Sequence, residues 1–255
     1  MSTRGPVPSR AWWLQTGLLD FAPGDSDKRR PMAVSVKICG ITEGEALDAA
    51  LRAGADFVGF AFHPTSPRNL PYGKAADLAL KARGRARIVA LLVDPDDAAV
   101  ERAVNAIQPD FVQLHGRESP QRLADLRSCF GRPLIKALAV AEAEDLRGVA
   151  RYEPVADMFL FDAQAPKGAT RPGGHGLAFD WRLLQHQRIG RPWLLAGGLN
   201  PDNVALALSV SGAPGVDVSS GVEVKPGIKD PQLIQAFVAA ARGVLPQSVQ
   251  QGSSA

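Results

Sequence analysis

Eight short apolar segments alternate with eight helix-like segments along most of the chain, and this alternation restricts the fold more than any other feature. Most of the apolar segments are rich in Val, Ile, Leu or Phe, as expected of strands that are buried on both faces. The expected strands are residues 34–38, 57–62, 88–93, 111–114, 134–138, 158–161, 193–196 and 216–218. The expected helices are residues 43–53, 73–82, 96–107, 120–129, 141–150, 181–186, 203–209 and 231–241.

Strands that alternate with helices pair in parallel, and eight such units are what a closed barrel requires. We therefore predict the α/β class and a (β/α)8 TIM barrel, a single catalytic domain at 34–245. A doubly wound Rossmann sheet is the alternative, but no Gly-x-Gly-x-x-Gly follows the first strand. The proline-interrupted segment 1–33 predicts a poorly ordered extension, and the polar segment 246–255 predicts a disordered tail.

Composition and charge exclude several classes of protein. The sequence contains no run of about 18 apolar residues, so no membrane-spanning helix is predicted. Two cysteines cannot build a disulfide framework. The segment 11–19 is apolar, but no small-x-small cleavage site follows it, so we expect a cytoplasmic protein and not a secreted one. The formal net charge is +3, yet the chain after residue 33 carries 24 basic and 23 acidic residues. This balance argues against a nucleic-acid partner.

Polar residues and glycines follow most of the expected strands, on the rim where TIM barrels place their active sites. Gly197-Gly198 follows the seventh strand, and Ser219-Ser220-Gly221 follows the eighth. Loops at these two positions commonly bind phosphate through backbone N–H groups, although each loop alone is also compatible with an ordinary turn. No Walker motif is present, so the predicted partner is a phosphorylated small molecule.

A cysteine and a lysine share one face at the end of the first strand. Cys39 follows Lys37 by two residues, and a neighbouring cation lowers the pKa of a thiol, as a proton-abstracting cysteine requires. Lys37 has an equally weighted alternative, a structural ion pair with Asp217 on the adjacent eighth strand. The other cysteine, Cys129, is predicted to pack on a helix.

Charged side chains that follow other strands are further candidates for functional residues. Asp162 ends an apolar strand and is a candidate general acid, whereas Asp94, which precedes a proline, is expected to cap a helix. Arg68 is either a carboxylate clamp or a solvated loop arginine. The rim residues His63 and His115 lack metal-ligand spacing, so we predict neither a metal nor a cofactor. A capping box at 42–45 indicates the start of the first expected helix.

Seven ordered motifs resemble the phosphoribosylanthranilate isomerase family and span nearly all of residues 34–242. The motifs are VKICGIT at 36–42, GADFVGF at 54–60, SPR at 66–68, VQLHG at 112–116, FDW at 179–181, AGGLNPDNV at 196–204 and VDVSSGVE at 216–223. The resemblance implies a TIM-barrel isomerase of tryptophan biosynthesis. Its reaction would be a cofactor-free Amadori rearrangement of N-(5-phosphoribosyl)anthranilate, catalysed by a monomer or a homodimer.

The resemblance also assigns roles to individual residues. It implies Cys39 as general base, Asp162 as general acid and Arg68 as the residue that binds the anthranilate moiety. We group His115 with the substrate-binding residues of the same rim. The implied phosphate-binding residues are Gly197, Gly198, Ser219, Ser220 and Gly221. One departure is Leu177, which stands where the family usually has Lys or Arg.

Three alternative functions lie outside this assignment. Other phosphosugar barrels isomerise aminoaldoses with two aspartates, but Cys39 occupies the place of the first. Indoleglycerol-phosphate synthase would need a lysine at the end of the third strand, where this chain has Asp94. The third alternative is a non-catalytic phosphosugar-binding barrel, against which the retained acid and base argue.

Overall fold

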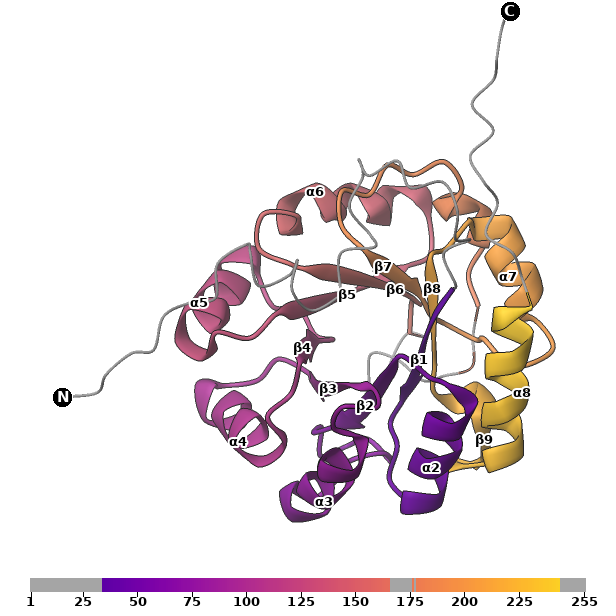
Figure 1. Ribbon diagram of the computed structural model, residues 1–255. Helices are drawn as coiled ribbons and strands as arrows, with labels where there is room; N and C mark the ends of the chain where they lie inside the picture. Colours follow the sequence, from indigo (N-terminus) through magenta and orange to yellow (C-terminus); the bar gives the residue numbers. More distant parts are fainter. Residues whose placement is uncertain (1–33, 166–175, 177, 244–255) are drawn as a thin grey trace, which may run out of the picture.

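Eight parallel strands close into a barrel in chain order, and helices surround it (Figure 1). The computed structural model describes residues 34–165, 176 and 178–243. The predicted fold class, a (β/α)8 barrel, is confirmed. The expectations for 1–33, for 246–255 and for Leu177 concern residues outside the described ranges. Among the described helices, none has the length and apolar character needed to cross a membrane.

The observed elements lie close to the expected ranges. The barrel strands are β1 Ser35–Cys39, β2 Phe57–Ala61, β3 Arg87–Leu92, β4 Phe111–Leu114, β5 Leu134–Val140, β6 Met158–Ala163, β7 Trp193–Leu195 and β8 Gly215–Val218. The helices of two turns or more are α2 Gly44–Ala53, α3 Tyr72–Ala82, α4 Asp97–Ile107, α5 Pro120–Phe130, α7 Val204–Ser211 and α8 Pro231–Arg242. The first and last of the described helices, α2 and α8, lie side by side and close the ring around the barrel (Figure 1).

The core has two parts, one between the barrel and its helices and one inside the barrel. The inner cluster draws alternate residues from neighbouring strands, for example Met158 and Leu160 of β6. Because side chains alternate across a strand, Asp162 continues this inward series at the carboxyl end of β6. Lys37 and Cys39 occupy inward positions of β1 by the same argument, since Lys37 pairs with the inner-cluster residue Phe57. The fold thus directs the candidate acid and base into the barrel.

The prediction of an α-helix is wrong for two of the expected helical segments. Residues 141–150 form a 3-10 helix, η1 Ala143–Gly148, followed by the single turn α6 Val149–Tyr152. The Asp145 carboxylate accepts hydrogen bonds from the Ala141 and Glu142 amides, which tightens this segment at its start. Residues 181–186 form only the short 3-10 helix η2 Trp181–Leu184, and His186 then adopts a positive φ of 68° that ends the helical path.

Two predictions of helix capping are also wrong, and so is the prediction that Cys129 packs against the core. Asp94 does not cap α4, since its Oδ1 accepts from the Arg117 amide while Asp96 accepts from the Ala99 amide as the true cap. The capping box at 42–45 is absent, because the Thr42 hydroxyl donates to the Gly227 carbonyl, 2.8 Å away. Cys129 lies on α5 but is exposed, because it falls off the apolar face of that helix.

An antiparallel hairpin follows β8 and was not expected from the sequence. Its strands are β9 Glu223–Lys225 and β10 Ile228–Lys229, joined to β8 by the 3-10 turn η3 Ser220–Val222. Both strands are very short, and apolar and charged residues alternate within them. The sequence therefore shows no apolar run at these positions. The Thr42 hydroxyl fastens the hairpin turn to the loop after β1, so the hairpin lies beside the carboxyl end of the barrel.

Candidate active site

Cys39 ends β1 inside the barrel, and the neighbouring strand leaves room for its sulfur. Its register partner on β2 is Gly59, and a Cβ placed at Gly59 would lie 3.0 Å from the Cys39 Sγ atom. Lys37 and Asp217 are register partners on β1 and β8, and the Lys37 Nζ atom lies 2.8 Å from Asp217 Oδ1. The ion pair that the sequence offered as an alternative therefore forms, directly beneath the thiol.

The charges around Cys39 act on its pKa in opposite directions. Burial raises the pKa of the Cys39 thiol above its ordinary value, the Lys37 ammonium lowers it, and the Asp217 carboxylate raises it. Lys37 thus lowers the pKa of the thiol as expected, but burial and the Asp217 carboxylate outweigh its effect. Burial alone would lower the pKa of Lys37, but Asp217 and Cys39 together raise it above its ordinary value. Lys37 therefore stays charged. Because the net pKa of Cys39 is raised by burial, the thiolate, once formed, is a stronger base than an ordinary one.

Asp162 forms a chain of contacts with two residues of β4 and the loop that follows. The Asp162 Oδ2 atom lies 3.2 Å from His115 Nε2, and His115 Nδ1 lies 3.1 Å from the Gln113 side-chain amide nitrogen. Asp162 and Gln113 are both buried, and the Gln113 Oε1 atom has no hydrogen-bond partner among the described residues. His115 was predicted on this rim, and the structure orients it toward the candidate acid.

The two candidate phosphate loops contact each other and the end of β6. Gly197 has a φ of 87°, and a Cβ there would lie 2.6 Å from the Ala163 amide nitrogen and 3.1 Å from the Asp162 Oδ1 atom. Gly198, with a φ of 62°, also adopts a left-handed conformation. A Cβ at Gly221 would lie only 1.8 Å from the carbonyl oxygen of Leu199. These close approaches require glycine, because any other residue would force the loops apart.

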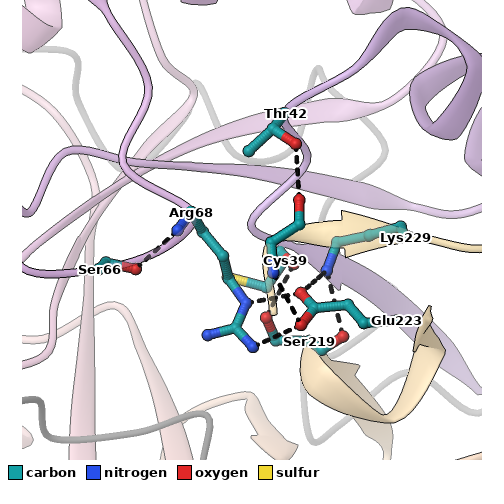
Figure 2. A network of polar contacts seen from close by, with 8 residues as sticks. Cys39, Thr42, Ser66, Arg68, Ser219, Glu223 and Lys229 are labelled. Carbon is teal, nitrogen blue, oxygen red and sulfur yellow. Dashed lines mark hydrogen bonds and ion pairs between the residues drawn. The ribbon is translucent and has the colours of Figure 1, made fainter. Parts of the chain in front are cut away.

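Arg68 and Ser219 lie near Cys39 in one polar network (Figure 2). The Ser219 hydroxyl donates to the Cys39 carbonyl, 3.1 Å away, which ties the loop after β8 to the end of β1. Arg68 is only 6% exposed, so the solvated-loop interpretation is wrong. Its guanidinium donates from Nε and Nη2 to the two carboxylate oxygens of Glu223, at 2.7 and 2.8 Å.

Sequence reasoning missed four residues that organise this rim. Glu223 and Lys229 belong to the unexpected hairpin, and Gln113 lies in a strand where apolar residues surround it. Asn203 holds the loop after β7, since its amide donates to the Gly198 carbonyl and its oxygen accepts from the Asn200 amide. Only one sequence pattern could have revealed any of these four residues, namely a polar residue at a position expected to be buried. Of the four, only Gln113 fits this pattern.

The described residues contain no group of three or more His, Cys, Asp or Glu side chains placed to hold a metal ion. His63, one of the two histidines considered above, instead has its Nε2 atom 2.8 Å from the Thr65 hydroxyl. The rim therefore presents a buried thiol, a buried carboxyl, a held arginine and two glycine-containing loops. A closed parallel barrel with this set of groups defines the class of (β/α)8-barrel enzymes that act on phosphorylated small molecules.

The comparisons with known proteins identify the family within that class. The model of the family described as N-(5'phosphoribosyl)anthranilate (PRA) isomerase matches residues 36–240, and the chain belongs to this family. The N-(5'-phosphoribosyl)anthranilate isomerase of Rhodopseudomonas palustris (strain BisA53) is 54% identical over 211 residues, 83% of this chain and 97% of that protein. The crystal structure of phosphoribosyl anthranilate isomerase from Thermotoga maritima is 34% identical, with a TM-score of 0.75 over 83% of this chain and all of that one.

Proposed function

We propose that this enzyme converts N-(5-phosphoribosyl)anthranilate to 1-(2-carboxyphenylamino)-1-deoxyribulose 5-phosphate in tryptophan biosynthesis, with Cys39 as general base and Asp162 as general acid. The observation that carries the proposal is the placement of these two groups at inward positions of β1 and β6, at the same end of the barrel. Family membership supports the reaction, and one related structure, 32% identical, is described in complex with the reduced product.

The proposed reaction needs one proton donor and one proton acceptor. The Asp162 carboxyl group would give its proton to the ring oxygen of the ribose, the bond from that oxygen to C1 would break, and the nitrogen lone pair would form a C1=N bond. The Cys39 thiolate would then remove the proton from C2, and the resulting enolamine would tautomerise to the ketone. Each proton transfer by a positioned group typically contributes about 10²–10⁴-fold in rate.

The contacts of the two groups suit these roles. The hydrogen-bonding distance between His115 and Asp162 fixes the carboxyl group, and the Ala163 amide donates to the other carboxylate oxygen at 2.9 Å. Burial of Cys39 raises the pKa of the thiol, so the thiolate that forms is a strong base for a carbon acid. Lys37, held in place by Asp217, provides the charge that limits the cost of that thiolate.

The two anionic ends of the proposed substrate have separate binding groups. The loop residues Gly197, Gly198, Ser219, Ser220 and Gly221 would bind the phosphate through their backbone N–H groups, and Arg68 would bind the carboxylate of the anthranilate ring. Because these contacts are remote from the reacting carbons, they would orient the sugar between the acid and the base. We propose that the enzyme acts in the cytoplasm, as a monomer or as a homodimer.

The test is turnover and ligand binding in two near-isosteric variants. Cys39→Ser and Asp162→Asn should each lose about 10²–10⁴-fold in kcat, while the dissociation constant for the reduced product changes little. Cys129→Ser, which removes the exposed thiol, and Asp97→Asn, which removes an exposed carboxylate of α4, are matched controls that should keep full activity. Near-normal turnover of either site variant would refute the assignment. Binding without turnover in the unaltered protein would instead favour a phosphosugar-binding barrel.

A further inference from the structure

The Glu223 carboxylate lies buried at the centre of the network in Figure 2. Its Oε1 atom accepts from Arg68 Nε at 2.7 Å and from Lys229 Nζ at 3.0 Å. Its Oε2 atom accepts from Arg68 Nη2 at 2.8 Å and from the Gly227 amide at 3.2 Å. Four donors therefore converge on one carboxylate, so neither Glu223 nor the groups around it can rotate freely.

This arrangement fixes the conformation of Arg68. One edge of its guanidinium, formed by Nε and Nη2, is committed to Glu223, and among the described residues Nη1 has no hydrogen-bond partner. The aliphatic part of the side chain packs on the loop after β1, since a Cβ at Gly40 would lie 2.4 Å from Arg68 Cδ. The Arg68 backbone amide also donates to the Ser66 hydroxyl. A guanidinium held in this way loses little conformational entropy when its remaining edge binds a ligand.

Lys229 sets the net charge of the network. Its side chain is fully buried, and Nζ donates to the Ser219 carbonyl at 3.1 Å as well as to Glu223. Without Lys229, the Glu223 carboxylate would cancel the charge of Arg68, and the pair would not attract an anion. Burial lowers the pKa of Lys229 below its ordinary value, but the Glu223 carboxylate opposes that shift and favours the charged ammonium. With Lys229 protonated, two cations share one carboxylate and leave one formal positive charge. The backbone contact to Ser219 also joins this charge to the loop that would hold the phosphate.

We propose that Glu223 and Lys229 are positioning residues that make the enzyme selective for a substrate whose aromatic ring carries a carboxylate. Glu223 holds Arg68 so that its Nη1 edge meets the carboxylate, and Lys229 preserves the positive charge that this contact needs. Neither residue has to touch the substrate. The inference rests on the proposed function, because it takes the anthranilate carboxylate as the group that Arg68 binds.

The experiment compares two ligands that differ only in the carboxylate. The first is the reduced 1-(o-carboxyphenylamino)-1-deoxyribulose 5-phosphate, and the second is the same compound without the carboxylate. Dissociation constants for both are measured by titration calorimetry with the unaltered protein, Arg68→Met, Glu223→Gln and the double variant. Glu223→Gln leaves an additional positive charge, but it also releases Arg68 from its fixed orientation, and we expect the second effect to outweigh the first. Binding of the carboxylate ligand should weaken about tenfold and binding of the second ligand less than twofold. The double variant should be no weaker than Arg68→Met, because Glu223 acts through Arg68.

Two further variants keep the test decisive if Glu223→Gln does not fold. Lys229→Met should also reduce selectivity for the carboxylate ligand, because it removes the surplus positive charge. Glu223→Asp, which keeps the charge, should recover part of the selectivity. Glu43→Gln is a matched control, since it removes the carboxylate of an exposed ion pair with Lys74 and should change neither constant.

The outcomes separate the two proposals. If Arg68→Met leaves the preference for the carboxylate ligand unchanged, Arg68 does not bind that group and its assignment under the proposed function fails. If Arg68→Met abolishes the preference but Glu223→Gln and Lys229→Met preserve it, only the positioning proposal is overturned. Equal weakening of both ligands by Glu223→Gln would also overturn it, because Glu223 would then support the whole site and not Arg68 in particular.

Discussion

The contact between the two phosphate loops can be tested by adding a single methyl group. In Gly221→Ala, the new Cβ would lie 1.8 Å from the Leu199 carbonyl oxygen, 2.8 Å from its carbonyl carbon and 3.1 Å from the Cα atom of Asn200. An ordinary carbon–oxygen contact is about 3.3 Å, so the loops must separate by about 1.5 Å. All three neighbours are backbone atoms, so no side chain can rotate away to accommodate the methyl group.

A separation of this size should be visible in both affinity and stability. Misplacement of a positioning group by about 1 Å can cost about 100-fold in rate, so we expect kcat/KM to fall 10–100-fold, about 1.4–2.7 kcal/mol. Overpacking typically destabilises a protein by about 1–3 kcal/mol. The assay is steady-state turnover, together with calorimetric titration by inorganic phosphate and urea unfolding. Phosphate affinity should fall in parallel with kcat/KM.

A matched control separates loop geometry from the general effect of a glycine substitution. Gly73 lies in α3, is exposed, and has no atom within 4 Å of an added Cβ. Gly73→Ala should leave kcat/KM unchanged and stabilise the helix by about 0.5–1 kcal/mol. Unaltered phosphate affinity and KM in a folded Gly221→Ala variant would refute the view that these two loops form the phosphate site.

Two further predictions follow from the pKa shifts. Burial raises the pKa of Cys39, so in a Cys129→Ser background the rate of Cys39 alkylation by iodoacetamide should still be rising above the ordinary thiol pKa of about 8.5; a plateau below that pH would contradict the shift. Burial alone would raise the pKa of Glu223, but the Arg68 hydrogen bond and the Lys229 charge outweigh it, and the pKa lies below the ordinary 4.5. This carboxylate therefore contributes stability that is present above pH 4.5 and is lost as the pH falls through the lower folded pKa. The difference in urea unfolding free energy between the unaltered protein and Glu223→Gln should shrink over that acid range, and a constant difference would exclude the linkage.

The barrel could be predicted because its determinants are local and repeated. Each apolar strand and each amphipathic helix is visible within a window of about ten residues, and the eightfold alternation then favours closure. The candidate acid and base were also accessible, since Cys39 and Asp162 lie at strand ends, which a barrel gathers on one rim. Short segments were less predictable. The η1 and η2 turns look helical in composition, but hydrogen bonds at their ends decide between 3-10 and α geometry.

The partners of the buried charges could not be predicted from the sequence. Arg68 and Glu223 are separated by 155 residues, and Glu223 lies in a hairpin without an apolar pattern. Viewed alone, Arg68 is as compatible with a solvated loop as with a binding site. Only the folded register shows that both side chains are buried against each other. The Lys37–Asp217 pair was foreseeable because β1 and β8 must be neighbours in a closed barrel, which makes topology a source of pairings.

These buried charges also bear on the chemistry of the thiol. Lys37 is balanced by Asp217, whereas Arg68 and Lys229 share the single carboxylate of Glu223, so the network nearest Cys39 holds one uncompensated positive charge. Burial raises the pKa of Cys39 overall, and the charges of Lys37 and, to a smaller extent, Lys229 lower it and so limit that rise. A bound carboxylate at Arg68 would neutralise the surplus charge, and the thiolate would then be less stabilised than in the free enzyme. The same contact that orients the substrate would therefore strengthen the base that attacks it.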